Sequence, residues 1–197
     1  MINETELKLR LGSQAQMNRA LAWCEQHLGK GSRLEQRDEY YDTAGEDLRN
    51  HDLSLRLRTV NGKTLVAMKS PRVFLTENIH DRIELEFAAA DRSDVLQTIE
   101  RYGLKPTAIT EKVRWKFEKD DFTVMLDQLP FIGCFAEIEA PNVGRINDVV
   151  AMLGLSPSDG INKNYSELLE DKLTQLGLPL RPNLRATFSE EAKWKVV

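Results

Sequence analysis

The chain has few of the residues that build disulfide frameworks or metal clusters. Of its 197 residues, two are cysteines and three are histidines. Cys24 and Cys134 fit no metal-binding spacing, and two cysteines are too few for the disulfide framework of a small secreted domain. The N-terminal residues also lack the basic and apolar regions of a signal peptide. We therefore expect a protein of the reducing cytoplasm.

Long apolar runs and an excess of basic charge are missing as well. No apolar run approaches the roughly 20 residues that a membrane-spanning helix needs. The formal net charge is −4, so bulk charge gives no reason to expect binding to nucleic acid or to anionic membranes. Any anion site must therefore be local, built by basic residues gathered on one surface.

No Pro/Gly/Ser-rich linker, low-complexity segment or solenoid repeat divides the chain. Its length and its 41% hydrophobic content suit one globular domain with a sizeable core. We assign residues 1–178 to that domain. Residues 179–197 form a C-terminal tail without an assigned role, in which we expect Ser189 to cap a short final helix.

Strand patterns outnumber helical ones. Alternation and turn signals predict strands at 2–11, 34–42, 53–59, 64–69, 79–88, 111–118, 122–129 and 134–140. Helical spacing predicts helices from Ser13 to Gly29, from Asp91 or Ser93 through Tyr102 to Gly103, over 145–153 and over 163–176. This combination is typical of an α+β domain.

Charged residues recur on one face of several predicted strands, because residues two apart on a strand point the same way. The charged rows are Glu4, Glu6 and Lys8; Arg56 and Arg58; Arg82, Glu84 and Glu86; Lys112, Arg114 and Lys116; and Glu137 and Glu139. Such a row is usually a solvated outer face. Here, however, acidic and basic residues are interleaved on the same face. The like-charged neighbours within a row repel each other unless a counter-ion lies between them. The opposite faces of these strands are apolar enough to be covered by helices. These features favour a closed barrel with a charged interior, which also removes sheet edges.

The hairpins bring further charges to the same face. Asn61-Gly62 is a strong signal for a two-residue turn, which would place Lys69 on the face of the two arginines. A bulged three-residue turn would reverse that parity. If Asp120-Asp121 is likewise a two-residue turn, the pairing of the two strands that flank it places Asp127 opposite Arg114. The alternating row Glu35, Arg37 and Glu39 fits either a solvated face or a barrel wall.

The two kinds of charge suit one class of ligand. The four Glu-x-Glu carboxylates, Glu4, Glu6, Glu137 and Glu139, are hard oxygen ligands suited to Mg²⁺ or Mn²⁺. The basic residues are suited to phosphate oxygens: Lys8, Arg56, Arg58, Lys69, Lys112 and Arg114. Acid and base in one confined site would bind a polyanion through metals and cations together, as phosphoryl transfer requires.

An ordered set of motifs over residues 2–170 resembles the CYTH superfamily, the triphosphate tunnel metalloenzymes. The set comprises Glu4-Thr5-Glu6-Leu7-Lys8, Tyr40-Tyr41-Asp42-Thr43, Leu55-Arg56-Leu57-Arg58, Lys69, Arg82-Ile83-Glu84-Leu85-Glu86, Glu111-Lys112-Val113-Arg114, Leu126-Asp127, Gly133 to Glu139, and Lys163 to Leu169. The family includes class IV adenylyl cyclases, thiamine triphosphatases, and inorganic or nucleoside triphosphatases.

The resemblance implies an eight-stranded antiparallel tunnel with helices outside and with two Mg²⁺ or Mn²⁺ ions bound. The implied metal ligands are Glu4, Glu6, Glu137 and Glu139, assisted by Asp127 and Glu86. The implied substrate-binding residues are Lys8, Arg56, Arg58, Lys69, Arg82, Lys112, Arg114 and Lys163. Catalysis would rest on the four glutamates with Asp127, Lys8, Arg56, Arg58, Lys69 and Arg114.

The expected activity is metal-dependent hydrolysis of a triphosphate, with inorganic triphosphate favoured over nucleoside or thiamine triphosphates. One alternative is an adenylyl cyclase that makes cyclic AMP from ATP. Another is a non-catalytic module that binds polyphosphate or nucleotide. The expected partner is a small triphosphate-bearing molecule, with no nucleic acid and no membrane, and the family also suggests a homodimer.

Overall fold

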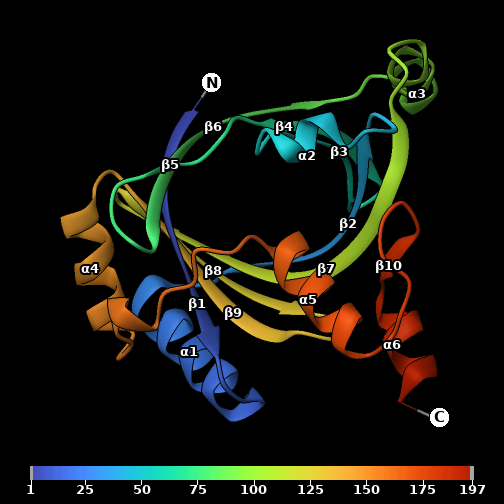
Figure 1. Cartoon of the computed structure of the whole chain (residues 1–197). Coiled ribbons are helices and arrows are strands. Elements are labelled where there is room, and N and C mark those ends of the chain that lie inside the picture. The colour runs from blue at the N-terminus through green and yellow to red at the C-terminus, as the bar shows by residue number, and fades with distance from the viewer. Residues whose placement is uncertain (1, 196–197) are drawn as a thin grey trace.

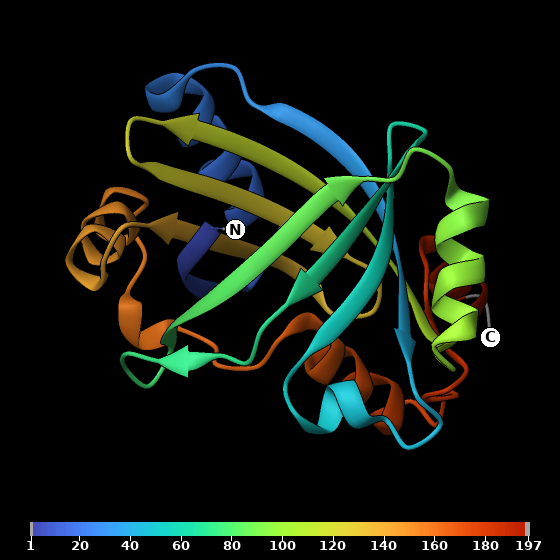
Figure 2. The ribbon, with the colours of Figure 1, turned by 90° about the horizontal axis from the view of Figure 1, so that it is seen from above.

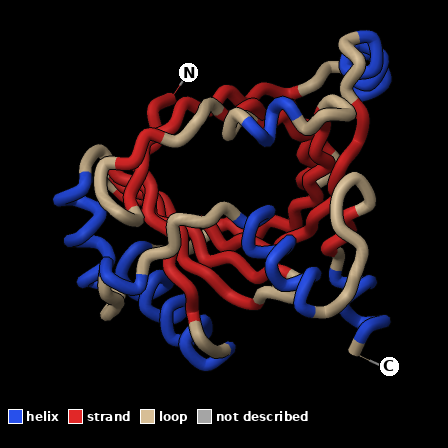
Figure 3. The backbone as a smooth tube through the Cα atoms, in the orientation of Figure 1, coloured by secondary structure: helices blue, strands red, loops and turns tan. Residues whose placement is uncertain are grey.

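Eight antiparallel strands form a closed barrel (Figures 1 and 3). This structure, a computed structural model, describes residues 2–195, with side chains for residues 5–195. Around the barrel the strands are β1 (Ile2–Leu11), β9 (Gly133–Ala140), β8 (Phe122–Leu129), β7 (Lys105–Lys119), β2 (Ser32–Asp42), β3 (Ser54–Val60), β4 (Lys63–Lys69) and β6 (Ile79–Ala88). Pairing of β1 with β6 closes the ring. The α+β barrel expected from the sequence is thereby confirmed.

Two short strands extend the sheet beyond the ring. Strand β5 (Val73–Phe74) pairs with β6, and β10 (Leu184–Ala186) pairs in parallel with β7. The segment after residue 178 is therefore attached to the barrel by backbone pairing. It continues into α6 (Phe188–Trp194), which is capped by Thr187, two residues before the expected Ser189.

The two hairpin registers confirm the turn analysis. Asn61 and Gly62 both have positive φ, 49° and 74°, as a two-residue type I′ turn requires. Lys69 lies opposite Ser54 on the face that carries the arginines, and Asp127 lies opposite Arg114. The local turn chemistry thus sets which side chains enter the barrel.

Two helices cover the outside of β1, β9 and β8. Helix α1 (Gln14–Leu28) follows the Ser13 cap and buries Met17 and Cys24. Helix α4 (Val143–Met152) begins after the Asn142 cap, two residues earlier than expected. Between these helices and the barrel lies a core of strand residues that alternate with the charged rows, among them Leu7, Leu9, Val124, Leu126 and Ile138.

The other side of the barrel is only partly covered. Helix α3 (Arg92–Arg101) follows β6 and lies across the barrel from α1 and α4 (Figure 2). Ile99 packs with Leu57 and Val66 in a smaller cluster. Tyr102, expected on the same apolar face, is instead 79% exposed because the helix ends at Arg101. Beyond α3, the outward-facing side chains are exposed by 42–48%: Met68, Ile83, Leu85 and Phe87.

Helix α5 (Tyr165–Gln175) packs against the inner face at one end of the barrel. Phe135 lies on the same face of β9 as Glu137, and its ring meets the ring of Tyr165 edge-on, with centroids 5.2 Å apart. Leu169 and Leu173 are buried in the same cluster. Asn164 caps the helix, so Lys163 lies just before it and not within it.

The remaining elements are short connections. Helix α2 (Asp47–Asn50) lies in the segment between β2 and β3, and a 3₁₀ turn, η1 (Pro157–Asp159), lies between α4 and α5. Neither was expected from the sequence, since both are too short to show a helical period. Within residues 2–195, no helix is long and apolar enough to cross a membrane.

Candidate functional site

A cavity of about 540 Å³ lies inside the barrel. Its lining includes most of the site residues expected from the sequence: Glu6, Lys8, Arg56, Arg58, Lys69, Arg82, Lys112, Arg114, Glu137 and Glu139. They come from six different strands, which the closed barrel turns toward one space. Glu4 is on β1, but its side chain lies outside the described residues.

Five charged side chains interlock on the wall formed by β1, β9, β8 and β7. Lys8 Nζ lies 3.3 Å from Glu137 Oε1, and Lys112 Nζ lies 3.1 Å from Asp127 Oδ2. Arg114 joins the two pairs: its Nε donates to Asp127 Oδ1 at 2.7 Å, and its Nη2 also contacts Glu137. Asp127 is fully buried. Each buried charge therefore has an opposite partner, as burial requires.

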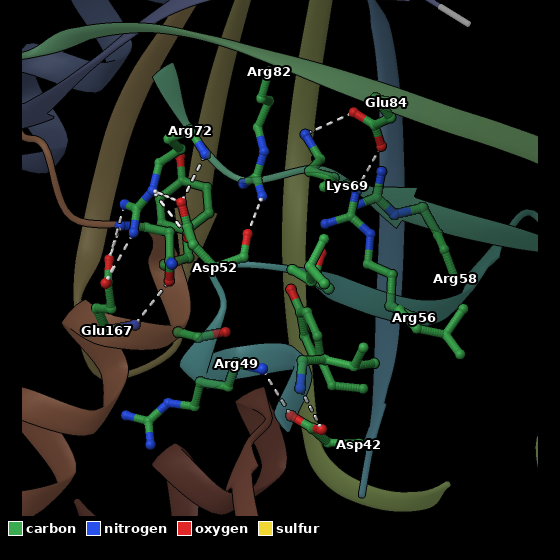
Figure 4. Close-up of a pocket in the computed structure, with 18 of the residues that line it drawn as sticks. Asp42, Arg49, Asp52, Arg56, Arg58, Lys69, Arg72, Arg82, Glu84 and Glu167 are labelled. Atoms are coloured by element: carbon green, nitrogen blue, oxygen red, sulfur yellow. Dashed lines mark hydrogen bonds and ion pairs between the residues drawn. The ribbon is translucent and has the colours of Figure 1, made fainter. Parts of the chain in front are cut away.

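The opposite wall carries a second set of ion pairs, partly visible in Figure 4. Arg58 makes a two-pronged pair with Asp38, with N–O distances of 2.8 and 2.9 Å. Glu84 accepts from Lys69 Nζ at 2.6 Å and from Arg56 Nη2 at 3.2 Å. The Nε of Arg56 is buried without a hydrogen-bond partner among residues 5–195. An oriented donor of this kind suits a phosphate oxygen.

The carboxylates gather where β1 meets β9. Glu6 lies directly opposite Glu139 in the register, and Glu6 Oε1 is 2.9 Å from His80 Nε2. Burial alone would raise the pKa of Glu6, but the His80 hydrogen bond and the charge of Lys69 lower it to about 2. Burial, followed by the charges of Glu6 and Glu137, raises the pKa of Glu139 to about 7. The site thus holds crowded negative charge on this side.

These carboxylates have the chemistry of a divalent-metal site. Among residues 5–195, no three Asp, Glu, His or Cys side chains stand close enough to form a compact metal cluster. Glu6, Glu137 and Glu139 nevertheless line one cavity. The pKa of Glu139 is raised by burial and then by the charge of Glu6, and a bound cation would offset both effects. The donor set therefore fits Mg²⁺ or Mn²⁺, with Glu4 as the further expected ligand.

Some expected residues lie at the edge of the cavity or outside its lining. Asp127 lies behind the cavity, bonded to Lys112 and Arg114. Glu86 is 3.7 Å from Arg58 Nη1, with a side chain that is 36% exposed. The Nζ of Lys163 pairs with Asp171 at 2.5 Å, and this side chain is about half exposed.

Arg82 is held by backbone carbonyls at the cavity wall. Its Nε donates to the oxygen of Ser70 at 3.0 Å, and its Nη2 donates to that of Asp52 at 3.2 Å (Figure 4). Burial lowers the pKa of this guanidinium. Arg82 thus lies in the lining, as expected, and its Nε and Nη2 hold two loops in place.

The lining also includes Arg72, from a loop, and Tyr165, the first residue of α5, and the sequence analysis gave neither residue a role. Arg72 donates to Asp52 at 2.9 Å and to Glu167 at 3.1 Å, which joins two loops to α5 (Figure 4). Tyr165 donates from its hydroxyl to Asp127 Oδ2 at 2.9 Å. The one available signal was the motif from Lys163 to Leu169, of which only Lys163 was given a role.

Comparison with known proteins agrees with this geometry. The family model for the CYTH domain matches residues 3–145. A Methanocaldococcus jannaschii protein described as a candidate adenylate cyclase is 26% identical over 143 residues, which are 68% of this chain and 80% of that protein.

Solved structures share the fold. A protein of Pyrococcus horikoshii is 27% identical, with a TM-score of 0.67, over 84% of this chain and 98% of that one. A Hippeastrum protein, described as a candidate adenylyl cyclase with a dominant triphosphatase activity, is 18% identical, with a TM-score of 0.63, over 90% of this chain and 97% of that one. The closed barrel, its charged cavity and the matched residues together show that this chain belongs to the CYTH domain family.

Proposed function

We propose that this protein hydrolyses a triphosphate with the help of Mg²⁺ or Mn²⁺, and that inorganic triphosphate is its preferred substrate. One observation carries the proposal: cations and carboxylates from opposite walls line a single cavity of about 540 Å³. Cations alone would suit a binding module, whereas the added carboxylates Glu6, Glu137 and Glu139 suit metal-assisted phosphoryl transfer.

The basic side chains bind and orient the phosphate chain. Arg56 and Arg58 stand on neighbouring positions of one face of β3, and Arg56 keeps an unused buried donor, Nε. Arg114, locked by Asp127 and Glu137, presents fixed positive charge from the other wall. A polyanion between the walls would be held without reorganisation of these groups, which is how preorganised charge lowers a phosphoryl-transfer barrier.

The carboxylates would hold the divalent cation. Glu6, Glu137 and Glu139 supply oxygen ligands, and Glu4, two residues before Glu6 in the sequence, is the further expected ligand. A cation bound there supplies Lewis-acid polarisation of phosphate oxygens and lowers the pKa of water. The barrel walls surround the site with protein of lower dielectric than water, which strengthens each charge interaction in the cavity.

A second candidate function is adenylyl cyclase, because the Methanocaldococcus jannaschii relative is described as a candidate for that activity. The same basic residues would then hold ATP, and the ribose hydroxyl would attack the innermost phosphorus. The products distinguish the two reactions. A cyclase converts ATP to cyclic AMP and pyrophosphate, whereas the hydrolase converts inorganic triphosphate and water to pyrophosphate and orthophosphate, so cyclic AMP and orthophosphate are the products that differ.

A product assay tests the proposal. Tripolyphosphate, ATP and thiamine triphosphate are supplied separately with Mg²⁺ or Mn²⁺, and orthophosphate, pyrophosphate and cyclic AMP are quantified. We expect orthophosphate from tripolyphosphate, with at least about a hundredfold loss of kcat/KM in Arg56→Ala and in Glu137→Gln. Arg33→Ala is the matched control, because the Arg33 side chain is 53% exposed and forms an ion pair with Glu35, outside the cavity lining.

Two outcomes would contradict the hydrolase. Cyclic AMP and pyrophosphate from ATP, without orthophosphate from tripolyphosphate, would assign the cyclase reaction to this cavity. Tight binding of tripolyphosphate without any product would leave a binding module as the best account.

A further inference from the structure

Tyr165 lies where the wall of β1, β9, β8 and β7 meets the inner helix. It is the first residue of α5, and its ring faces two lysine ammonium groups of the cavity. Lys8 Nζ lies 4.3 Å from the ring centroid, and Lys112 Nζ lies 5.1 Å from it. Both distances are within the roughly 6 Å over which an aromatic face attracts a cation.

The hydroxyl of Tyr165 is fixed from the other side. It donates to Asp127 Oδ2 at 2.9 Å, the same oxygen that lies 3.1 Å from Lys112 Nζ. Burial and the charges of Asp127 and Glu137 raise the pKa of Tyr165 well above its ordinary value. The phenol therefore keeps its proton and remains a donor, so the ring cannot turn away without losing this bond.

The lysines need such a support because the cavity crowds like charges. Lys112 stands beside Arg114 on one face of β7, and both side chains are buried. Lys8 has Glu137 as its ion-pair partner, which Arg114 also contacts. The electron-rich face of the ring stabilises the charged form of both ammonium groups without neutralising them, as an additional carboxylate would.

We propose that Tyr165 is a positioning residue that holds the ammonium groups of Lys8 and Lys112 toward the cavity, where they bind the phosphate chain. The inference rests on the proposed function, since it takes a triphosphate as the ligand. It adds a residue to which the sequence analysis gave no role. Through the Asn164 cap and the packing of Leu169, the position of α5 becomes part of the phosphate site.

The Tyr165 ring also packs against Phe135, so the test must separate a role in packing from a role in holding the lysines. The variant Tyr165→Phe keeps the ring and loses the hydroxyl, whereas Tyr165→Leu loses the aromatic face and keeps apolar bulk. Leu173→Val is the matched control: Leu173 is 1% exposed on the same helix, so this change loosens the packing of α5 without altering the face that the lysines meet.

Binding of tripolyphosphate is measured by calorimetry in EDTA, where no metal contributes and no turnover occurs. We expect Tyr165→Leu to raise the Kd about tenfold and Tyr165→Phe to raise it about twofold or less, with Leu173→Val near the wild type. Equal affinity of Tyr165→Leu and the wild type would overturn the proposal. Equal weakening by Leu173→Val and Tyr165→Leu would do so as well, since helix packing alone would then explain the effect.

A spectroscopic test uses the wild-type protein as its reference. Protons on the terminal methylene of a lysine above an aromatic face are shifted upfield by the ring, and we expect this for Lys8 and its loss in Tyr165→Leu. Unshifted resonances in the wild type would contradict the geometry directly. A wild type that binds tripolyphosphate without hydrolysing it would refute the proposed function alone, because the binding comparison needs no turnover.

Discussion

The two halves of the barrel carry similar inner faces but differ in what lies behind them. Behind β1, β9 and β8 are two helices and the largest core, in which Leu7, Val124 and Ile138 have no exposed surface. Behind β4 and β6, the outward side chains of Leu85 and Phe87 are 42% and 48% exposed. We call these the backed wall (β1, β9, β8, β7) and the thin wall (β3, β4, β6).

The ion pairs follow this division only in part, since the pairs of Arg58 with Asp38 and of Lys69 with Glu84 are also largely buried. On the backed wall, Arg114 joins Asp127 and Glu137, and Asp127 is fully buried. On the thin wall, the side chain of Glu86, near Arg58, is 36% exposed. Since buried pairs are screened less by water and salt than exposed ones, the backed wall holds its charges in one arrangement. A charged lumen therefore depends on the apolar layer behind it, and the predictions below test that dependence.

The largest expected effect comes from removing the central cation of the backed wall. Arg114→Ala removes one buried partner from both Asp127 and Glu137, which keep Lys112 and Lys8 as partners, so we expect the free energy of unfolding to fall by about 3 kcal/mol. The matched change on the thin wall is Lys69→Ala, after which Glu84 still has Arg56; we expect a loss of about 1 kcal/mol. Urea denaturation of both variants measures the difference, and equal losses would refute the distinction between the walls.

The apolar layers themselves should differ in the same direction. Leu126 is fully buried between β8 and the covering helices, so Leu126→Ala should cost about 3 kcal/mol of unfolding free energy. Leu85→Ala on the thin wall should cost less than about 1 kcal/mol, because the side chain is already 42% exposed. Thermal and urea unfolding of the pair check this. A cost at Leu85 that matches Leu126 would mean that the thin wall is covered in solution.

A smaller effect depends on pH at the seam between β1 and β9. The pKa of Glu139 is raised from 4.5 to about 7 by burial and by Glu6. Folding therefore favours the protonated carboxyl. This stabilisation is complete below pH 4.5 and is lost as the pH rises through 7. Glutamine does not ionise, so the free energy of unfolding of Glu139→Gln should not fall in this way. Between pH 5 and pH 7.5 the stability of the variant should therefore rise relative to that of the wild type by on the order of 2 kcal/mol.

Urea denaturation in EDTA across that pH range measures the Glu139 effect, with metal removed so that it cannot neutralise the cluster. A constant difference between the two proteins would show that Glu139 is ionised throughout. Glu118→Gln serves as the control, since the Glu118 side chain is 69% exposed and its pair with Lys116 lies at the surface.

Much of the barrel was predictable because its determinants are local. The period of two along each strand identified the charged rows, and the Asn61-Gly62 turn determined the register that brings Lys69 beside the arginines. The row Glu35, Arg37 and Glu39 was ambiguous, and the structure places it on the outer side, where Arg37 pairs with Glu111. The intervening Asp38 enters the barrel and pairs with Arg58. On its own face of the strand, Asp38 lies between Gln36 and Tyr40, so this face shows no row of charges that the sequence analysis could have detected.

The parts that escaped prediction depend on contacts between distant segments. Arg72 reaches Glu167 across 95 residues of sequence, from a loop without any periodicity. Lys163 was expected to face the phosphates, but the Asn164 cap sets where α5 begins, and the Lys163 side chain pairs with Asp171. Loop conformation and helix docking decide such details, and neither is encoded in a local period.

The position of β1 in the ring has a consequence for how the protein reaches its folded state. This first strand pairs with β6 from the middle of the chain and with β9 from near residue 140. During synthesis, Glu6 and Lys8 emerge early, but β1 has both of its neighbouring strands only once β9 has been made, at residue 140 of 197. Such high contact order slows folding, because loop closure precedes the contacts that stabilise it. The charged cavity is therefore incomplete in nascent chains that end before β9.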